Sequence, residues 1–333
     1  MDVSLSLTAL VVLVGLALAF DFLNGFHDAA NSIATVVSTG VLRPYQAVAW
    51  AAFFNFVAFA LFKLSVAATV GKGILAPEFV DAHVIASALA GAIAWDLITW
   101  YYGIPSSSSH ALIGGMMGAG MAKAGTAPLV TSGIVKTVAF IVISPLLGLL
   151  LGALLMVAVS WIFFHRSPYT VDQWFRRLQL LSSALYSIGH GSNDAQKTMG
   201  LIWLMLISGG VTPPDQLPFW VVASCYTAMA LGTLFGGWRI VRTMGQRITK
   251  LKPVGGFSAE AGGALTLFLA SSLGVPVSTT HTITGAIVGV GATQRVSTVR
   301  WGVAGNIVAA WIVTLPAAAL IAATVWWAGR LVH

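Results

Sequence analysis

The stretches NGFHDAANSIAT at residues 24–35 and HGSNDAQKTMGL at residues 190–201 decide the fold, because each places one aspartate inside an otherwise apolar region. A second pair of motifs follows them, GIPSSSSHALIGGMMG at residues 103–118 and GVPVSTTHTITGAIVG at residues 274–289. The sequence separation of Asp28 from Asp194 is nearly the same as that of His110 from His281. Two motifs in the same order at nearly the same spacing predict a duplicated fold.

The composition predicts a multi-pass membrane protein. Of the 333 residues, 57% are apolar and 8% charged, with a mean hydropathy of +0.88, whereas soluble domains carry roughly 25% charged residues. Most apolar stretches approach the roughly 20 residues that a spanning helix needs, but shorter ones flank the serine-rich motifs. We therefore expect an all-α membrane protein with about 10–12 membrane segments, including broken helices and re-entrant helical hairpins.

The basic residues predict the orientation in the bilayer. One set of connections is rich in lysine and arginine, and the positive-inside rule makes that side cytoplasmic. Its members are Arg43, Arg166, Arg176, Arg177, Arg239, Arg242, Arg247, Lys250, Lys252, Arg295 and Arg300. We expect lipid as the partner of this chain, and its net charge of +7 to reflect topology rather than nucleic-acid binding.

This charge pattern requires the two halves to face opposite ways across the membrane. We predict a first transport repeat at residues 1–165, a cytoplasmic connector at 166–177 and an inverted second repeat at 178–333. Inverted repeats with interrupted helices are typical of secondary transporters, which bind substrate and coupling ions near the bilayer midplane. A duplicated scaffold would not need the costly buried polar groups seen in these motifs.

Carboxylates within the apolar segments are the first candidate site residues, because a charge at membrane depth is expensive and usually functional. Asp28 and Asp194 occupy equivalent repeat positions, whereas Asp21 and Asp96 have no such partner and suit helix packing as well as function. Residues three or four apart share a helical face, so polar neighbours can join each aspartate. The predicted coupling-ion or proton residues are Asp28, Asn24, Asn31, His190, Asn193, Asp194 and Glu260.

The hydroxyl-rich motifs predict an anion site. A Gly-x-Pro turn precedes each hydroxyl run, and proline breaks one helix and suits the start of the next. A helix N-terminus with free N–H groups and hydroxyls binds phosphate or sulfate. The predicted substrate residues are Ser106, Ser107, Ser108, Ser109, Ser278, Thr279, Thr280, His110, His281 and Lys197. Glycines 114, 118, 285 and 289 predict close helix packing.

Enzyme chemistry is not indicated. The chain has no GxxxxGK[ST], HExxH or GxSxG constellation, and its one cysteine, Cys225, provides neither a disulfide nor a thiolate metal site. We therefore expect no catalytic residues and no resident cofactor.

The paired motifs resemble the inorganic phosphate transporter (PiT) family, whose signature reads approximately GANDVANA followed by GxPxSxTH in each half. The variants here are most similar to the bacterial low-affinity phosphate transporters. The resemblance implies a symporter that moves inorganic phosphate with a cation, and it implies transport roles for a set of residues in both halves. These are Asp28, His190, Asp194, Glu260, Ser107 and Ser278.

Two departures from the signature bear on the coupling ion. Lys197 replaces an amide, and Asn55 stands where sodium-coupled members tend to have glutamate. The bacterial branch implies proton coupling and phosphate carried as a complex with Mg²⁺ or another divalent metal, so we favour protons over sodium. The alternatives are a sulfate permease and a divalent cation channel or carrier. The sequence leaves open whether the protein forms a homodimer.

Overall fold

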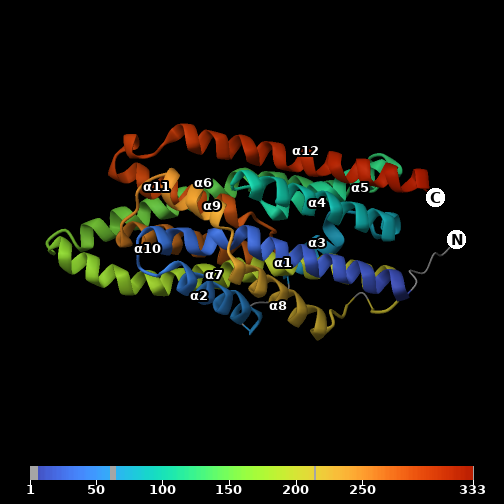
Figure 1. The fold of residues 1–333 in the computed structure, drawn as a ribbon, viewed down its shortest axis with the longest axis horizontal. Coiled ribbons are helices and arrows are strands. Elements are labelled where there is room, and N and C mark those ends of the chain that lie inside the picture. Colours follow the sequence, from blue (N-terminus) through green and yellow to red (C-terminus); the bar gives the residue numbers. More distant parts are fainter. Residues whose placement is uncertain (1–6, 61–64, 214, 333) are drawn as a thin grey trace.

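The computed structural model describes residues 7–60, 65–213 and 215–332, which form twelve α-helices and no β-strand (Figure 1). The predicted all-α fold is therefore confirmed. The helices are α1 (Leu7–Ser38), α2 (Pro44–Val57), α3 (Ser65–Gly73), α4 (Ala82–Tyr102), α5 (Ser108–Ala124), α6 (Thr131–Ile162), α7 (Pro168–Ser208), α8 (Phe219–Phe235), α9 (Trp238–Arg242), α10 (Pro253–Ser272), α11 (Thr279–Gln294) and α12 (Trp301–Val332). The predicted repeats also include residues 1–6, 61–64, 214 and 333, which lie outside the described residues.

Within the described residues, four helices are by themselves long and apolar enough to cross a membrane: α1, α4, α6 and α12. A fifth candidate is α8 together with the bent segment Trp238–Arg247, at an angle of 61°. Helices α5 and α11 have only 17 and 16 residues, and at 1.5 Å per residue they are shorter than a bilayer core of about 30 Å. They are the half-helices that the short apolar stretches predict.

The breaks before the two half-helices are built alike. Helix α4 ends at Gly103 with φ of 66°, and α10 is followed by Gly274 with φ of 64°. This left-handed conformation favours glycine because a Cβ atom would clash with the backbone. An extended segment containing proline follows, and Ser107 or Ser278 then caps the next helix. Each half thus contains one helical hairpin with a hydroxyl-rich tip.

The two hairpins enter from opposite ends of the molecule. Figure 1 places α4 and α5 toward one end and α10 and α11 toward the other, and α1 and α7 run in opposite directions. Contacts gather the basic connections at one end, where Arg176 donates to the carbonyl of Gly40 and the Arg300 N–H donates to that of Ile248. The opposite end is held by the Lys123–Asp81 ion pair at 2.7 Å.

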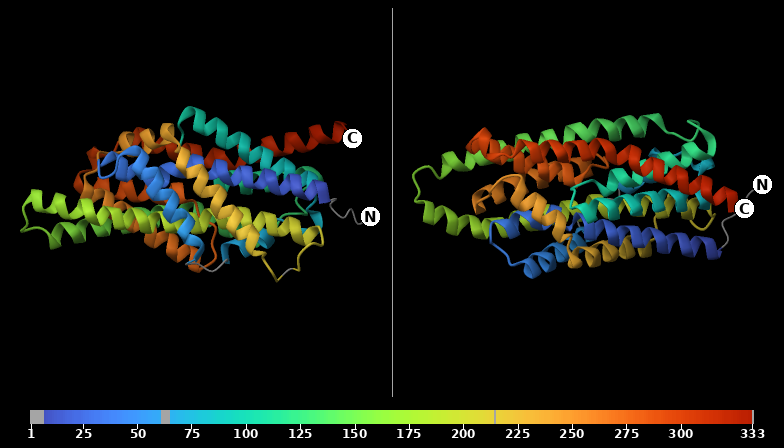
Figure 2. Two further views of the ribbon diagram at one scale, coloured as in Figure 1. Left: turned by 60° about the horizontal axis from the view of Figure 1, so that its bottom comes forward. Right: turned by 45° about the horizontal axis from the view of Figure 1, so that its top comes forward.

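Small residues allow each hairpin to pack tightly against the other half of the chain. The right view of Figure 2 shows the long red helix α12 running beside the helices of the first hairpin. A Cβ atom at Gly118 of α5 would lie 2.1 Å from the carbonyl oxygen of Ala319 in α12. One at Gly289 of α11 would lie 2.2 Å from that of Leu149 in α6. Gly114 and Gly285 approach Leu315 and Pro145 in the same way. The predicted close packing is confirmed, and it joins the first half to the second.

The apolar core has two parts, and the polar motif of α1 lies between them. Leu10, Leu13, Ala17 and Phe20 belong to one buried cluster, while the segment from Ala30 onward belongs to the other. Most motif residues between these stretches, among them Asn24, His27 and Asp28, are buried as well. This position places the candidate site near the middle of the molecule.

The segment 166–177, predicted as the connector, is helical from Pro168 onward. Ser167 caps α7 by accepting from the Thr170 N–H, and proline at the first helical position is already preorganised. Asp172 and Arg176 then form an i,i+4 ion pair at 2.8 Å. The non-helical link between α6 and α7 is therefore confined to residues 163–167.

Candidate functional site

The two motif aspartates meet in the centre of the molecule, one from α1 and one from α7. Asp28, His190 and Asp194 each present a ligand atom, and these atoms all lie within 4.8 Å of one another. The three side chains are at most 2% exposed. Carboxylate and imidazole groups at this spacing could hold a metal ion, a coupling cation or a proton.

On the first-half side, Asp28 is joined to an imidazole and a hydroxyl. Nδ1 of His27 lies 2.6 Å from Oδ1 of Asp28, and Ser108 at the start of α5 donates to the same oxygen at 3.3 Å. The other imidazole nitrogen of His27 lies 3.0 Å from the hydroxyl of Thr99, which itself accepts from Ser106 at 2.9 Å. A buried network therefore links Asp28 to both ends of the first hairpin tip.

On the second-half side, Asp194 is joined to an ammonium group. Nζ of Lys197 donates to Oδ1 of Asp194 at 2.6 Å, and Thr279 of α11 donates to Oδ2 at 2.9 Å. Nε2 of His190 lies 3.2 Å from the same Oδ2 atom. His190, Asp194 and Lys197 thus converge on one face of α7, as their spacing predicts.

The hydroxyl-rich tips face each other across this cluster. Asn31 of α1 donates to Thr279 at 3.1 Å and to Thr280 at 2.9 Å, whereas Ser109 of α5 donates to Asp194 at 3.4 Å. Behind the tips, the rings of His110 and His281 make an edge contact at 4.7 Å. Two helix N-termini, each with free N–H groups, therefore point into one buried region.

Three predicted residues lie outside this central cluster. Asn193 donates to the Ser271 hydroxyl and the Val275 carbonyl and accepts from the Val277 N–H, so it holds the segment before α11. Asn24 is buried one turn before Asp28, and its Oδ1 atom has no hydrogen-bond partner among the described residues.

Glu260, the third of these residues, forms a second polar cluster. Its carboxylate accepts from Thr35 at 2.6 Å, from Gln179 at 2.9 Å and from Ser182 at 2.5 Å. Thr35 is the last residue of the first motif, so α1 connects this cluster with the central one. The hydroxyls and the amide donate to the carboxylate, which has no cationic partner among the described residues.

Further residues contact the site. The imidazole of His27 contacts the Asp28 carboxylate, although direct neighbours in a helix do not share a face. Asn55 of α2, the position that differs from sodium-coupled members, lies 3.2 Å from Nδ1 of His190. Sequence reasoning missed Thr99 of α4, because nothing in the sequence relates it to His27. The buried Asp21 accepts from Thr198, which fits a packing contact between α1 and α7.

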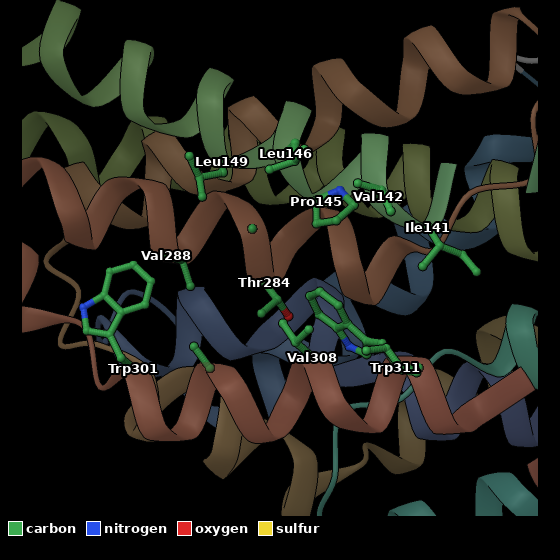
Figure 3. Close-up of a pocket in the computed structure, with 13 residues that line it drawn as sticks. Ile141, Val142, Pro145, Leu146, Leu149, Thr284, Val288, Trp301, Val308 and Trp311 are labelled. Carbon is green, nitrogen blue, oxygen red and sulfur yellow. The ribbon is translucent and has the colours of Figure 1, made fainter. Parts of the chain in front are cut away.

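A separate hollow of about 350 Å³ between α6, α11 and α12 is apolar (Figure 3). None of its 13 lining residues carries a charge, and Val142, Leu146 and Ile312 are exposed. A bilayer would cover this face. Trp311 connects the hollow with the site, because its ring stacks on His281 at 3.9 Å and its indole N–H donates to the Pro105 carbonyl at 3.1 Å.

The family profile described as "Phosphate transporter family" matches this chain over residues 24–172 and 164–322, which include both copies of both motifs. The chain belongs to the phosphate transporter family. The resemblance seen in the motifs is thereby confirmed, and family membership identifies a membrane transporter rather than an enzyme.

Relatives of this phosphate transporter family member match all or nearly all of its length. A protein of Rhizobium meliloti (strain 1021), named a probable low-affinity inorganic phosphate transporter, is 61% identical over 333 residues, or 100% of both chains. One of Bacillus subtilis (strain 168) with the same name is 47% identical over 97% of each chain. A solved structure titled "The sodium-dependent phosphate transporter" matches with a TM-score of 0.89 at 28% identity, covering 98% of this chain and 100% of that one.

Proposed function

We propose that this chain is a secondary symporter that carries inorganic phosphate across the cell membrane together with a coupling cation. The observation that carries the proposal is the meeting of two hydroxyl-rich helix N-termini at a buried pair of aspartates. An anion site and a cation site thus share one enclosed region, which is what coupled binding of phosphate and a cation requires. The basic end of the molecule would face the cytoplasm.

In this proposal the two hairpin tips hold the phosphate. Free N–H groups, the positive dipole ends of α5 and α11 and the hydroxyls suit a tetrahedral oxyanion. His110 and His281, in contact behind the tips, complete the site from each half-helix. The assigned phosphate residues are Ser106, Ser107, Ser108, Ser109, Ser278, Thr279, Thr280, His110 and His281.

The cation side of the site consists of Asp28, Asn31, His190 and Asp194. Imidazole and carboxylate groups accept protons, and carboxylate and amide oxygens also suit sodium or a divalent metal carried with the phosphate. Among these we propose proton coupling, with Glu260 as a further proton acceptor on the second cluster. Sodium is the competing cation, because a relative with the same fold is titled sodium-dependent. Asn193 orients the segment before α11, and Asn24 offers the cation an oxygen atom that has no hydrogen-bond partner among the described residues.

Two hollows at the basic end of the molecule lie beside the first hairpin tip. These adjoining hollows of about 390 and 450 Å³ share Tyr102, Gly103, Thr243 and Arg247, and the larger one reaches Pro105, directly before the serine run. Arg239 and Arg242 line the smaller hollow. Guanidinium groups attract phosphate, so these side chains would concentrate phosphate at the mouth of the hollow.

Uptake of radiolabelled phosphate into proteoliposomes tests the proposal. Proton and sodium gradients are imposed separately, with and without Mg²⁺. Asp28→Asn and Asp194→Asn should each lower gradient-driven uptake by about tenfold or more, because a lost charge-assisted interaction is worth about 1.5–3 kcal/mol. Asp172→Asn, which breaks only the exposed pair with Arg176, is the matched control and should transport normally.

Specific outcomes would contradict each part of this proposal. Normal coupled uptake in both aspartate variants would remove them from the coupling machinery. Competition by excess sulfate as effective as that by unlabelled phosphate would favour a sulfate permease. Cation flux of equal size without any phosphate would indicate a cation channel or carrier.

A further inference from the structure

The ammonium group of Lys197 is held in a shell of oxygen atoms. Nζ donates to Oδ1 of Asp194, to Oγ of Ser109 and to the main-chain carbonyl of Val277, each at 2.6 Å. The side chain is 2% exposed. One carboxylate, one hydroxyl and one main-chain carbonyl are the kinds of ligand that a hard cation takes in proteins. All three N–H donors of the ammonium are therefore used within the protein.

The equivalent position in the first half has no such charge. Asn31 occupies the same place after Asp28 that Lys197 occupies after Asp194. Its short neutral amide donates to Thr279 and Thr280 and makes no ion pair. Both side chains thus reach across to matching positions of the opposite hairpin tip, since Ser109 and Thr280 each directly precede the motif histidine. Only in the second half does the side chain also neutralise the aspartate.

This asymmetry changes the charge that mobile cations must supply. Asp28 has His27, His190 and Ser108 nearby, and of these only a protonated imidazole could balance its charge. Asp194 already has a fixed positive partner at 2.6 Å. Because the ammonium is tethered to α7, it stays in place when substrates enter and leave.

We propose that Lys197 is a built-in substitute for one coupling cation. Its ammonium fills the second-half cation position, so each transport cycle takes up one mobile cation fewer than a symmetric site would. This inference rests on the proposed symport function and assigns Lys197 to the cation side of the site rather than to the phosphate. A lysine that bound phosphate directly would have to release Asp194, Ser109 or Val277 to do so.

The test is to empty the position and ask whether sodium fills it. Lys197→Asn recreates the residue of the first half and leaves the oxygen atoms of Asp194, Ser109 and Val277 available. Thermal unfolding of the purified protein is followed in choline chloride and in sodium chloride at constant ionic strength, without phosphate. Sodium at ten times its dissociation constant stabilises the folded state by about tenfold, which for a chain of 333 residues corresponds to a rise in Tm of about 2 °C.

The expected result is a saturable sodium-dependent rise in Tm for Lys197→Asn beyond any rise seen with the wild-type protein. Asp194→Asn combined with Lys197→Asn should lose that extra rise, because the carboxylate ligand is gone. Lys123→Asn is the matched control, since it breaks the ion pair with Asp81 far from the site and should respond to sodium like the wild type.

Two outcomes would overturn the proposal. One is a sodium response of Lys197→Asn equal to that of the wild type. The other is aggregation of both Lys197→Asn and Lys197→Gln to the same extent in sodium chloride as in choline chloride. Sodium bound at the emptied position should restore folding, so equal aggregation in the two salts would contradict the proposal. The experiment contains no phosphate, so its failure would leave the proposed phosphate transport standing.

Discussion

Replacing Gly118 or Gly289 by alanine should damage the protein far more than the same change at an exposed glycine of α12. The added Cβ atom would lie 2.1 Å from the Ala319 carbonyl oxygen in the first case and 2.2 Å from that of Leu149 in the second. Real Cβ atoms essentially never come closer than 3.0 Å to another heavy atom. Each half-helix would therefore have to move away from its long partner by about 0.8–0.9 Å.

The cost follows from the nature of the atoms in contact. A main-chain carbonyl cannot turn away as a side chain can, so the helices themselves must separate. Adding a methyl group to a packed core costs about 1–3 kcal/mol. Alanine regains about 1 kcal/mol of helix propensity over glycine, but Gly305→Ala gains the same amount with nothing within 4 Å of its Cβ position. The difference between each variant and Gly305→Ala isolates the packing cost, which we expect to be about 1–3 kcal/mol.

Thermal unfolding of the purified variants measures this difference, at about 1–2 °C in Tm per kcal/mol for a chain of 333 residues. Phosphate uptake should fall in parallel, because a shift of α5 or α11 moves the hydroxyls that contact Asp28 and Asp194 at 2.9–3.4 Å. Equal Tm values for Gly118→Ala, Gly289→Ala and Gly305→Ala would refute the close backbone contact. An effect at only one of the first two would refute the equivalence of the two hairpins.

Three further changes probe groups around the site and at the ends of the molecule. Asp81→Ala should lower stability by about 1–2 kcal/mol, through loss of the cap on the Val84 N–H and of the partly exposed pair with Lys123. Although burial raises the pKa of the Asp81 carboxyl, hydrogen bonds from Lys123 and the backbone lower it below its ordinary value. The stabilisation by the Asp81 carboxylate is therefore complete above about pH 4 and is lost as pH falls through the lowered pKa. The Tm values of wild type and Asp81→Ala should accordingly converge when melting is followed at progressively lower pH. Glu260→Ala should lower the free energy of unfolding by at least about 2 kcal/mol, seen as a lower Tm, because three buried donors lose their acceptor. Glu260→Gln should lower it less. Trp311→Phe keeps the stacking but loses the bond to the Pro105 carbonyl, so chemical denaturation should show a loss of about 1 kcal/mol; unchanged stability would discount that bond.

The repeat made much of the fold predictable from the sequence. Glycine, proline and serine at matching positions predicted two hairpin tips, and Ser107 and Ser278 do cap the half-helices. The i,i+3 and i,i+4 spacing in α7 placed Lys197 and His190 beside Asp194. These features depend on local backbone chemistry, which adjacent residues determine.

The neighbours of each helix could not be predicted in the same way. Helices such as α6 and α12 are apolar on nearly all sides, so periodicity gives no preferred face and no partner. The pairing of α5 with α12 and of α6 with α11 therefore appears only in the structure. The same is true of Thr99 beside His27, because the two side chains are distant in sequence. Lys197 was predicted as a phosphate ligand, and only the structure shows that oxygen atoms of the protein already occupy its three donors.

The exchange of partners between the two halves has a consequence for how the protein is made. The glycine faces of α5 and α11 pack on helices from the opposite half, so the first hairpin completes its contacts only when α12 exists. Helix α5 ends at Ala124, and every helix from α6 to α11 is synthesised before α12 is finished at Val332. At about 5–20 residues per second, the ribosome needs roughly 10–40 s to synthesise the chain from the end of α5 to the end of α12. During synthesis the glycine face of α5 must therefore wait in the membrane without its partner, and the first hairpin completes its packing only once α12 is inserted.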